Sequence, residues 1–159
     1  MSTSTKPAAR PGLRPSRPYA VLAGRLTVAG LRPTRQRLAL ARLLFAAGDR
    51  HVTAEMLHDE TRQAGQTMSL ATVYNALNQF TAAGLLRTLS LDGTTIFDTN
   101  LAPHQHMLDT EKGVLCDLEP DAVVIAGTPK LPIGFDIERV DVIVRARPRK
   151  GAFRTRGKT

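Results

Sequence analysis

The sequence predicts an α+β protein with an N-terminal winged helix-turn-helix DNA-binding domain and a small C-terminal α/β domain. The first observation behind this prediction is that apolar side chains recur at helical spacing in four segments between residues 19 and 84. The second is that, beyond residue 85, apolar side chains fall into short runs separated by Gly, Pro and Asp, a pattern typical of strands joined by turns.

Each predicted helix ends at a glycine, and three of them begin at a residue that can cap a helix. The first spans residues 19–30. Thr34, Thr53 and Ser69 precede the other three, and a hydroxyl at such a position accepts a hydrogen bond from a backbone amide of the first turn. These helices are expected to extend to about Ala47, where Gly48 follows, and to Gly65 and Gly84, because glycine can adopt the left-handed conformation that ends a helix.

Strands are predicted from residue 85 onward. Residues 85–91 and 94–98 flank Asp92-Gly93, a pair suited to the positive φ angles of a tight hairpin turn, so this hairpin is the candidate wing. Farther along, we expect a strand at residues 113–117, a short helix or strand at 121–126 and a longer strand at 137–147. Because a few short strands are not stable alone in water, the C-terminal sheet is expected to be completed by a second copy of the chain.

The charge distribution divides the chain into four parts. The net charge of +8 favours a polyanionic partner, but residues 1–25 hold five basic and no acidic side chains, and residues 145–158 hold seven and none. We predict a disordered basic arm at residues 1–18 and a disordered basic tail at 148–159. Between them we expect the winged-helix domain at residues 19–98 and a second, acidic domain at 99–147.

Several classes of protein are disfavoured by the sequence. No run approaches the ~20 apolar residues that a membrane helix requires, and the N-terminus lacks an apolar secretion signal, so we expect a cytoplasmic protein. Cys116 is the only cysteine, which excludes an internal disulfide or a Cys-rich zinc site, and we expect it to be buried. There is no phosphate-binding glycine loop, nucleophile elbow or HExxH motif, and nothing favours a Cys116 nucleophile paired with His104, so an enzyme is not expected.

The helix that follows Ser69 presents an uncharged polar face suited to reading DNA bases. No charged side chain occurs between residues 69 and 86, and Thr72, Tyr74, Asn75 and Asn78 lie opposite the apolar face. Amide side chains recognise adenine in the major groove, and Thr or Tyr can pack against a thymine methyl. Phosphate contacts are expected from four further residues: Arg32, Arg35, Arg37 and Ser69. The alternative is an ordinary solvated helix of a helical bundle.

Histidines form a second group of interest. His51 lies just before the helix that Thr53 caps, and His104 and His106 follow the second wing strand. Imidazole together with carboxylate suits Fe, Mn or Zn, and His is also an axial ligand of haem iron. His104 and His106 are two residues apart, so on a strand both rings face one side and a third ligand must come from another segment. The alternative is a pair of solvated loop histidines.

Four motifs, in this order and at this spacing, resemble the Fur family of metal-responsive repressors, and within it the Irr subgroup of iron response regulators. They are residues 30–37 (GLRPTRQR), 51–57 (HVTAEML), 69–80 (SLATVYNALNQF) and 97–100 (FDTN). The subgroup is indicated by the Asp98-Thr-Asn stretch that leads into the histidines, and by the ending VDVIVRAR at residues 140–147. The resemblance implies an iron-responsive transcription regulator that binds inverted-repeat operators in double-stranded DNA as a homodimer.

The resemblance also implies roles for individual residues. Tyr74 and Asn75 match the base-contacting positions of the recognition helix, and Arg32 matches a basic residue that reaches toward the minor groove. Residues 99–147 would form the dimerisation and ligand-sensing domain. The regulatory ligand, haem or a divalent metal (Fe or Mn), is implied to bind at residues that fall on or beside the family's metal ligands: His51, Asp98, His104 and His106.

The chain departs from the family pattern in three ways. The paired cysteines that hold structural zinc in many members are absent, so no structural Cys-zinc site is expected and the dimer must rely on packing alone. Met107 stands where ordinary Fur proteins offer another histidine, and the Cys-Pro haem motif found near the N-terminus of some Irr proteins is missing. Two alternatives stay open: a Fur-type or manganese-responsive repressor that needs a divalent metal, and a sequence-indifferent nucleic-acid binder that acts through its basic arms.

Overall fold

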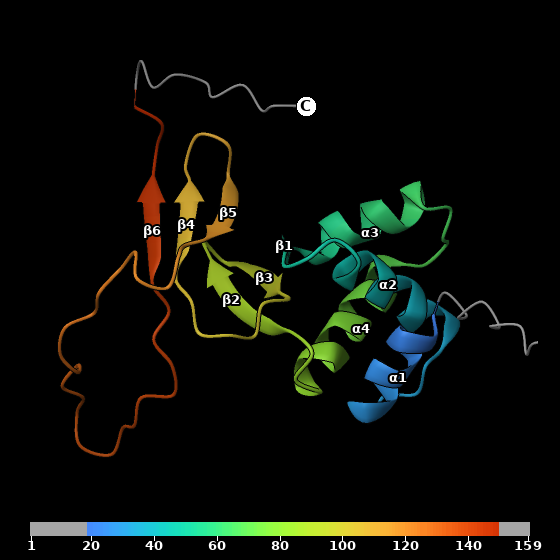
Figure 1. Ribbon diagram of the computed structural model, residues 1–159, viewed down its shortest axis with the longest axis horizontal. Coiled ribbons are helices and arrows are strands. Elements are labelled where there is room, and N and C mark those ends of the chain that lie inside the picture. Colours follow the sequence, from blue (N-terminus) through green and yellow to red (C-terminus); the bar gives the residue numbers. More distant parts are fainter. Residues whose placement is uncertain (1–18, 150–159) are drawn as a thin grey trace, which may run out of the picture.

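The computed structural model describes residues 19–149 and places four helices beside two small β-sheets (Figure 1). The predicted basic arm (1–18) and residues 150–159 of the predicted tail lie outside the described residues. The elements are, in chain order, α1 (Ala20–Val28), α2 (Arg35–Phe45), β1 (His51–Val52), α3 (Ala54–Gln63), α4 (Leu70–Ala82), β2 (Arg87–Leu91), β3 (Thr94–Asp98), β4 (His106–Asp109), β5 (Val114–Asp117) and β6 (Ile143–Ala146). The helices precede almost all of the strands, which confirms the α+β class. None of the helices in residues 19–149 has the length and apolar character needed to cross a membrane.

The three predicted helix caps are confirmed. The hydroxyl of Thr34 accepts a hydrogen bond from the Arg37 amide (3.3 Å), and Thr53 and Ser69 do the same for the amides three residues on (3.2 Å each). Gly84 follows α4 with a φ of +69°, a conformation that side chains other than glycine rarely adopt. The helix α4 therefore has defined ends at both sides.

The apolar face of α4 lies at the centre of the helical core. Val73, Leu77 and Phe80 are fully buried and pack with apolar side chains of the other helices and of β3. Each large apolar side chain removed from water in this way contributes about 1.5–3 kcal/mol. Because one face of α4 is used for this packing, its Thr, Tyr, Asn and Gln side chains remain toward the outer surface.

The first sheet contains the predicted wing. β2 and β3 are antiparallel, and Asp92 and Gly93 between them have φ angles of +50° and +81°, as the tight hairpin turn requires. β1, a two-residue strand that the apolar pattern did not predict, pairs with the other edge of β3. The strand order is therefore β1-β3-β2, with β3 in the middle.

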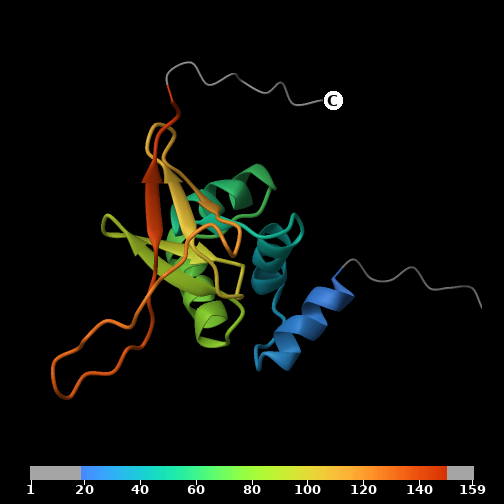
Figure 2. The same cartoon turned by 60° about the vertical axis from the view of Figure 1, so that its left-hand side comes forward.

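The second sheet has the strand order β5-β4-β6 and belongs to the C-terminal half. β5 is antiparallel to β4, and β6 is parallel to it. The long connection between β5 and β6 extends away from both sheets (Figure 1, Figure 2). Several of its apolar side chains are exposed, among them Val124, Ile133 and Phe135.

The C-terminal half differs from expectation at several positions. Residues 121–126 form neither a helix nor a strand: a turn and bends at 121–123 lead into irregular backbone, where Val124 and Ile125 are 85% and 53% exposed. The strand expected at 137–147 is shortened to β6, because residues 137–141 pair with no strand among the described residues. Cys116, expected to be buried, is exposed on β5, which is an edge strand of its sheet.

Candidate metal centre and DNA-reading surface

Three polar side chains lie in a row across the first sheet. The register pairs Asp98 of the central strand β3 with His51 of β1 on one side and with Arg87 of β2 on the other. Directly opposed residues on neighbouring strands project from the same face, so the three side chains meet. Asp98 is fully buried; it accepts hydrogen bonds from Arg87 Nε (2.7 Å) and from the Asn100 amide (2.8 Å).

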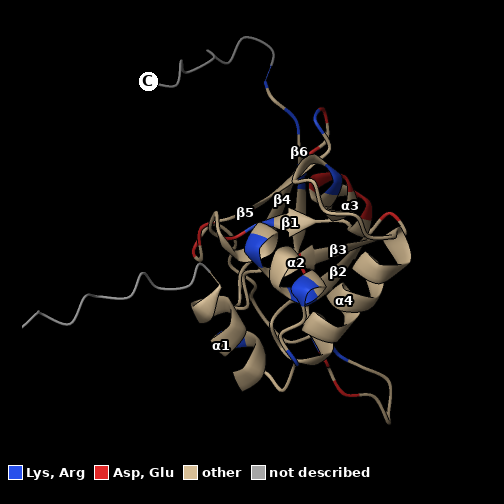
Figure 3. Cartoon of the chain, turned by 90° about the vertical axis from the view of Figure 1, so that its right-hand side faces the viewer, with Lys and Arg blue, Asp and Glu red and all other residues tan. Residues whose placement is uncertain are grey.

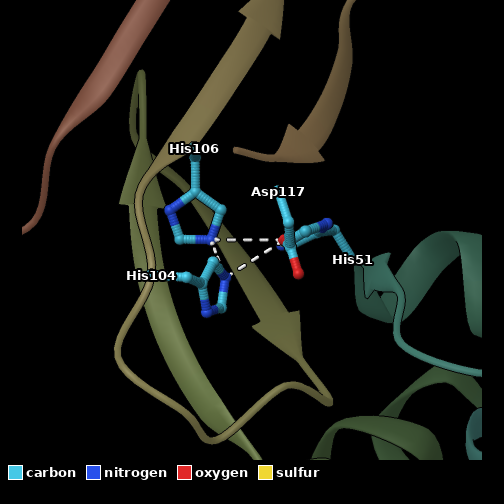
Figure 4. A group of neighbouring side chains, drawn as sticks. All are labelled: His51, His104, His106 and Asp117. Carbon is cyan, nitrogen blue, oxygen red and sulfur yellow. Dashed lines mark hydrogen bonds and ion pairs between the residues drawn. The ribbon is translucent and has the colours of Figure 1, made fainter. Parts of the chain in front are cut away.

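The second sheet and the connection that leads into it bring three more side chains to this row. Its register pairs His106 of β4 with Asp117 of β5, and His104 lies two residues before His106 in the connection from β3. Figure 4 shows the side chains of His51, His104, His106 and Asp117 converging from the two sheets and from the loop that precedes β4. One possible ligand atom from each lies within 4.8 Å of the others. We call these four residues the histidine centre.

The converging atoms are imidazole nitrogens and one carboxylate oxygen. Nε2 of His104 lies 2.9 Å from Nε2 of His106 and 3.1 Å from Oδ1 of Asp117. Nε2 of His51 lies 3.0 Å from the same oxygen. The side chains of His104 and His106 are 4% and 1% exposed, so their lone pairs meet away from bulk water. This set of nitrogen and oxygen donors suits a divalent ion such as Fe²⁺, Mn²⁺ or Zn²⁺.

The surroundings of His106 favour its neutral imidazole, the form that binds metal. Burial lowers the pKa of His106, the His104 and His51 rings lower it further, and Asp98 acts in the opposite direction. Nε2 of His51 is buried and has no hydrogen-bond partner among the described residues, because the nearby Asp117 oxygen does not meet hydrogen-bond geometry. A buried nitrogen without a partner is costly unless a ligand takes its lone pair. The residues present therefore fit a metal ion.

Of the four predicted ligands, the structure brings His51, His104 and His106 together and places Asp98 at the border of the centre. Oδ2 of Asp98 lies 3.3 Å from Nε2 of His104, but the carboxylate is already hydrogen-bonded to Arg87 and to a backbone amide. Asp117, which the sequence reasoning missed, contributes the carboxylate within the centre. Its only signal in the sequence is its place at the end of a predicted strand, whereas its position depends on the register with His106.

The outer face of α4 and the start of α2 form a second candidate surface. Figure 3 shows no charged residue on α4, while α2 carries arginines. Nε and Nη2 of Arg37 donate to Oε1 of Gln79 (3.1 and 2.6 Å), and Nη1 donates to the Arg32 carbonyl (2.8 Å). These bonds hold the guanidinium at the junction of the two helices. The shallow pocket at this junction is lined by Thr34, Gln36, Arg37, Thr72, Asn75, Ala76 and Gln79.

Tyr74 is held by a neighbouring helix. Its hydroxyl donates to Oε1 of Glu55 on α3 (3.0 Å). The hydrogen bond to Glu55 raises the pKa of Tyr74, while the pKa of Glu55 is lowered by its own backbone amide, by Thr53 and by Tyr74. Glu55 thus orients the ring at the edge of the polar outer face of α4, a role that the sequence reasoning did not assign.

The structure gathers only some of the predicted DNA-contacting residues. Thr72, Asn75 and Arg37 meet at the pocket described above, and Tyr74 lies one position from Asn75. The Ser69 hydroxyl contacts the amide and the hydroxyl of Thr72. The remaining predicted residues are exposed without being drawn into that pocket: Arg32, Arg35 and Asn78.

Residues 28–142 match the ferric uptake regulator family. The chain belongs to this family. The ferric uptake regulation protein of Pseudomonas fluorescens is 35% identical over 99 residues, which cover 60% of this chain and 80% of that protein. The Pseudomonas aeruginosa protein is 37% identical over 74 residues, 45% of this chain and 55% of its own length, so the match spans about half of that relative. Family members are transcription regulators and not enzymes.

Solved structures of the ferric uptake regulator family share the fold. The Pseudomonas aeruginosa ferric uptake regulator with manganese superimposes with a TM-score of 0.58 at 26% identity and covers 80% of this chain and 97% of that one. The Vibrio cholerae ferric uptake regulator gives a TM-score of 0.63 at 22% identity, over 80% and 99% of the two chains. The second likeness bears on the fold alone.

Proposed function

We propose that this chain is an iron- or manganese-responsive transcription regulator that binds operator DNA as a homodimer and senses the metal at the histidine centre. The observation that carries the proposal is where the ligands come from. His51 lies in β1, directly before the Thr53 cap of α3, whereas His106 and Asp117 lie in the second sheet. A bound ion would therefore link the helical half to the C-terminal half.

This link supplies a physical route from metal to DNA. Occupied by an ion, the centre restrains how the two halves sit relative to each other, and α3 packs directly on α4. Without the ion, β1 and the second sheet are joined by weaker contacts between side chains. Metal binding thus favours the conformations that have one placement of the reading helix. The size of the shift is set by how much more tightly the metal binds that placement than the other.

A divalent ion fits the histidine centre better than haem does. Haem iron takes protein ligands only at its axial positions, because the ring nitrogens occupy the others. Here three imidazoles and a carboxylate converge within 4.8 Å, an arrangement that suits one small ion. Iron is supported by the Irr-like motifs, and manganese by its presence in the Pseudomonas aeruginosa regulator. We therefore retain haem only as a competing outcome of the test below.

We assign base reading to α4 and phosphate binding to the residues around it. Tyr74 and Asn75 would contact base edges, with Thr72 and Asn78 beside them on the same helix. The phosphate-binding group comprises Arg32, Arg35, Arg37 and Ser69. The bonds from Arg37 to Gln79 and to the Arg32 carbonyl support this division, because they pre-position a cation next to a neutral reading face.

We infer that the subunits pair through the C-terminal half. β6 is an edge strand, and the connection before it exposes Val124, Ile133 and Phe135. Exposed apolar side chains on one segment are typical of surfaces that another chain covers. The chain lacks paired cysteines, so packing of such side chains would have to hold the dimer.

One experiment tests the metal and DNA assignments together. Purified full-length protein is used to select DNA from a random pool, with and without Fe²⁺, Mn²⁺, Zn²⁺ and haem. We expect an inverted repeat, bound in the nanomolar range only when metal is present. His104→Ala and Asp117→Ala should remove the metal response, whereas Asp121→Ala, at an exposed acidic position, should leave it intact.

Three results would contradict the proposal. A metal response that persists in His104→Ala would show that the histidine centre is not the sensor. A response to haem and not to metal would overturn the choice of ligand. Loss of all affinity after removal of residues 1–18 and 148–159, with no selected sequence in the intact chain, would favour a sequence-indifferent binder.

A further inference from the structure

Arg87 contacts the same imidazole nitrogens that would bind a metal ion. Its Nη2 lies 2.9 Å from Nε2 and 3.1 Å from Nδ1 of His104, and 3.4 Å from Nε2 of His106. Its Nε donates to Asp98, and its side chain is only 18% exposed. The guanidinium is therefore fixed at the histidine centre.

A guanidinium and a metal ion cannot both use these nitrogens. Each neutral imidazole has a single lone pair, which either accepts a hydrogen bond or binds a metal. Arginine remains charged at every physiological pH, so it cannot yield by losing a proton. Both species are cations in a site shielded from water, where like charges repel strongly.

Arg87 also satisfies the site when no metal is bound. Two carboxylates, Asp98 and Asp117, face three imidazoles that are neutral in the metal-binding form. The positive charge of Arg87 offsets part of this negative charge through its bond to Asp98 and its contacts with His104 and His106. Removing it would leave buried acceptors without their cation.

We propose that Arg87 is a resident cation of the histidine centre, which metal must displace and which thereby sets the metal affinity. The inference rests on the proposed metal-sensing function and deepens it. Arg87 is the first residue of β2, so its displacement reaches the wing directly. The proposal predicts two effects of opposite sign: without Arg87 the metal-free protein is less stable, yet the metal binds more tightly.

The test compares Arg87→Gln, Arg87→Lys and Arg145→Gln in the full-length chain. Arg145 pairs with Asp92 at the wing turn. Arg145→Gln serves as the control, because this substitution removes an arginine that contacts the wing but not the imidazoles. Mn²⁺ affinity is measured by calorimetry, and thermal unfolding is measured on chelator-treated protein. Circular dichroism confirms that each variant is folded.

We expect Arg87→Gln to bind Mn²⁺ about 10- to 100-fold more tightly than the original chain, because a charge close to the ion has been removed. Arg87→Lys keeps the charge and should remain close to the original affinity, as should Arg145→Gln. Metal-free Arg87→Gln should unfold several degrees lower. Binding by Arg87→Gln alone, with none by the original chain, would support Arg87 as a resident cation but would overturn both its displacement by metal and the metal-sensing proposal.

Other outcomes overturn the inference and are distinguishable from failure of the proposed function. If the original chain binds Mn²⁺ and Arg87→Gln binds it equally or more weakly, Arg87 is a structural support and the metal-sensing proposal survives. If the folded original chain and Arg87→Gln both bind no Mn²⁺, Fe²⁺ or Zn²⁺, the inference and the metal-sensing proposal fail together.

Discussion

Asp98→Asn offers a direct measure of how strongly the buried row across the first sheet holds the molecule together. Asp98 is 0% exposed, and the Arg87 side chain with which it pairs is 18% exposed. Asparagine keeps the size of the side chain and an oxygen that can accept the Asn100 amide, but it loses the charge and can turn an NH₂ group toward the guanidinium. The bond to Arg87, 2.7 Å long, is therefore the contact that the substitution tests.

The expected cost follows from the burial of this pair. A hydrogen bond to a charged group contributes about 1.5–3 kcal/mol, and breaking a buried pair on one side costs about 3–5 kcal/mol. Because Arg87 retains some access to water, we expect a value near the lower end, about 3 kcal/mol. For a chain of this size, 1 kcal/mol shifts the midpoint by about 2–4 °C, so the midpoint should fall by about 6–12 °C.

The assay is thermal unfolding of chelator-treated protein, followed by circular dichroism. Asp59→Asn is the matched control, because Asp59 is 66% exposed, lies 3.8 Å from Arg62, and should lose less than about 1 kcal/mol. The double variant Arg87→Gln/Asp98→Asn should lose less unfolding free energy than the two single variants lose in sum, because neither charge is then left buried without its partner. A midpoint for Asp98→Asn within about 2 °C of the original would refute the reasoning.

Three further predictions concern the reading helix and its core. Asn75→Ala should weaken binding to the selected operator by about 1–3 kcal/mol while leaving affinity for random DNA unchanged, measured at fixed salt; equal losses on both would contradict base reading. Glu55→Gln should lower the raised pKa of Tyr74 back toward 10, because the carboxylate that stabilises the neutral phenol is lost; an ultraviolet titration in which neither tyrosine moves would disprove the contact. Phe80→Ala should cost about 3–5 kcal/mol in urea unfolding, and a loss under about 1 kcal/mol would show that α4 does not anchor the core.

Much of the helical half and its hairpin could be predicted because their signals are local. Thr34, Thr53 and Ser69 satisfy amides three residues away, and Asp92-Gly93 turns the chain between adjacent strands, so each element needs only its own residues. The C-terminal half lacks such signals. The alternation at residues 137–147 predicted a long strand, yet only β6 is formed, because strand formation depends on a partner that local sequence does not specify.

What the sequence by itself determined is the helix α4 with its caps and polar face, the hairpin, and the presence of histidines at three positions. The tertiary structure alone decided which groups meet them. Asp117 enters the histidine centre through its register with His106, and Arg87 enters through its register with Asp98, which stands between it and His51. The physical reason is that helix caps and tight turns act over three or four residues, whereas a metal centre built across two sheets depends on how separate strands align. One position of slippage in β2 or β5 would turn Arg87 or Asp117 to the opposite face.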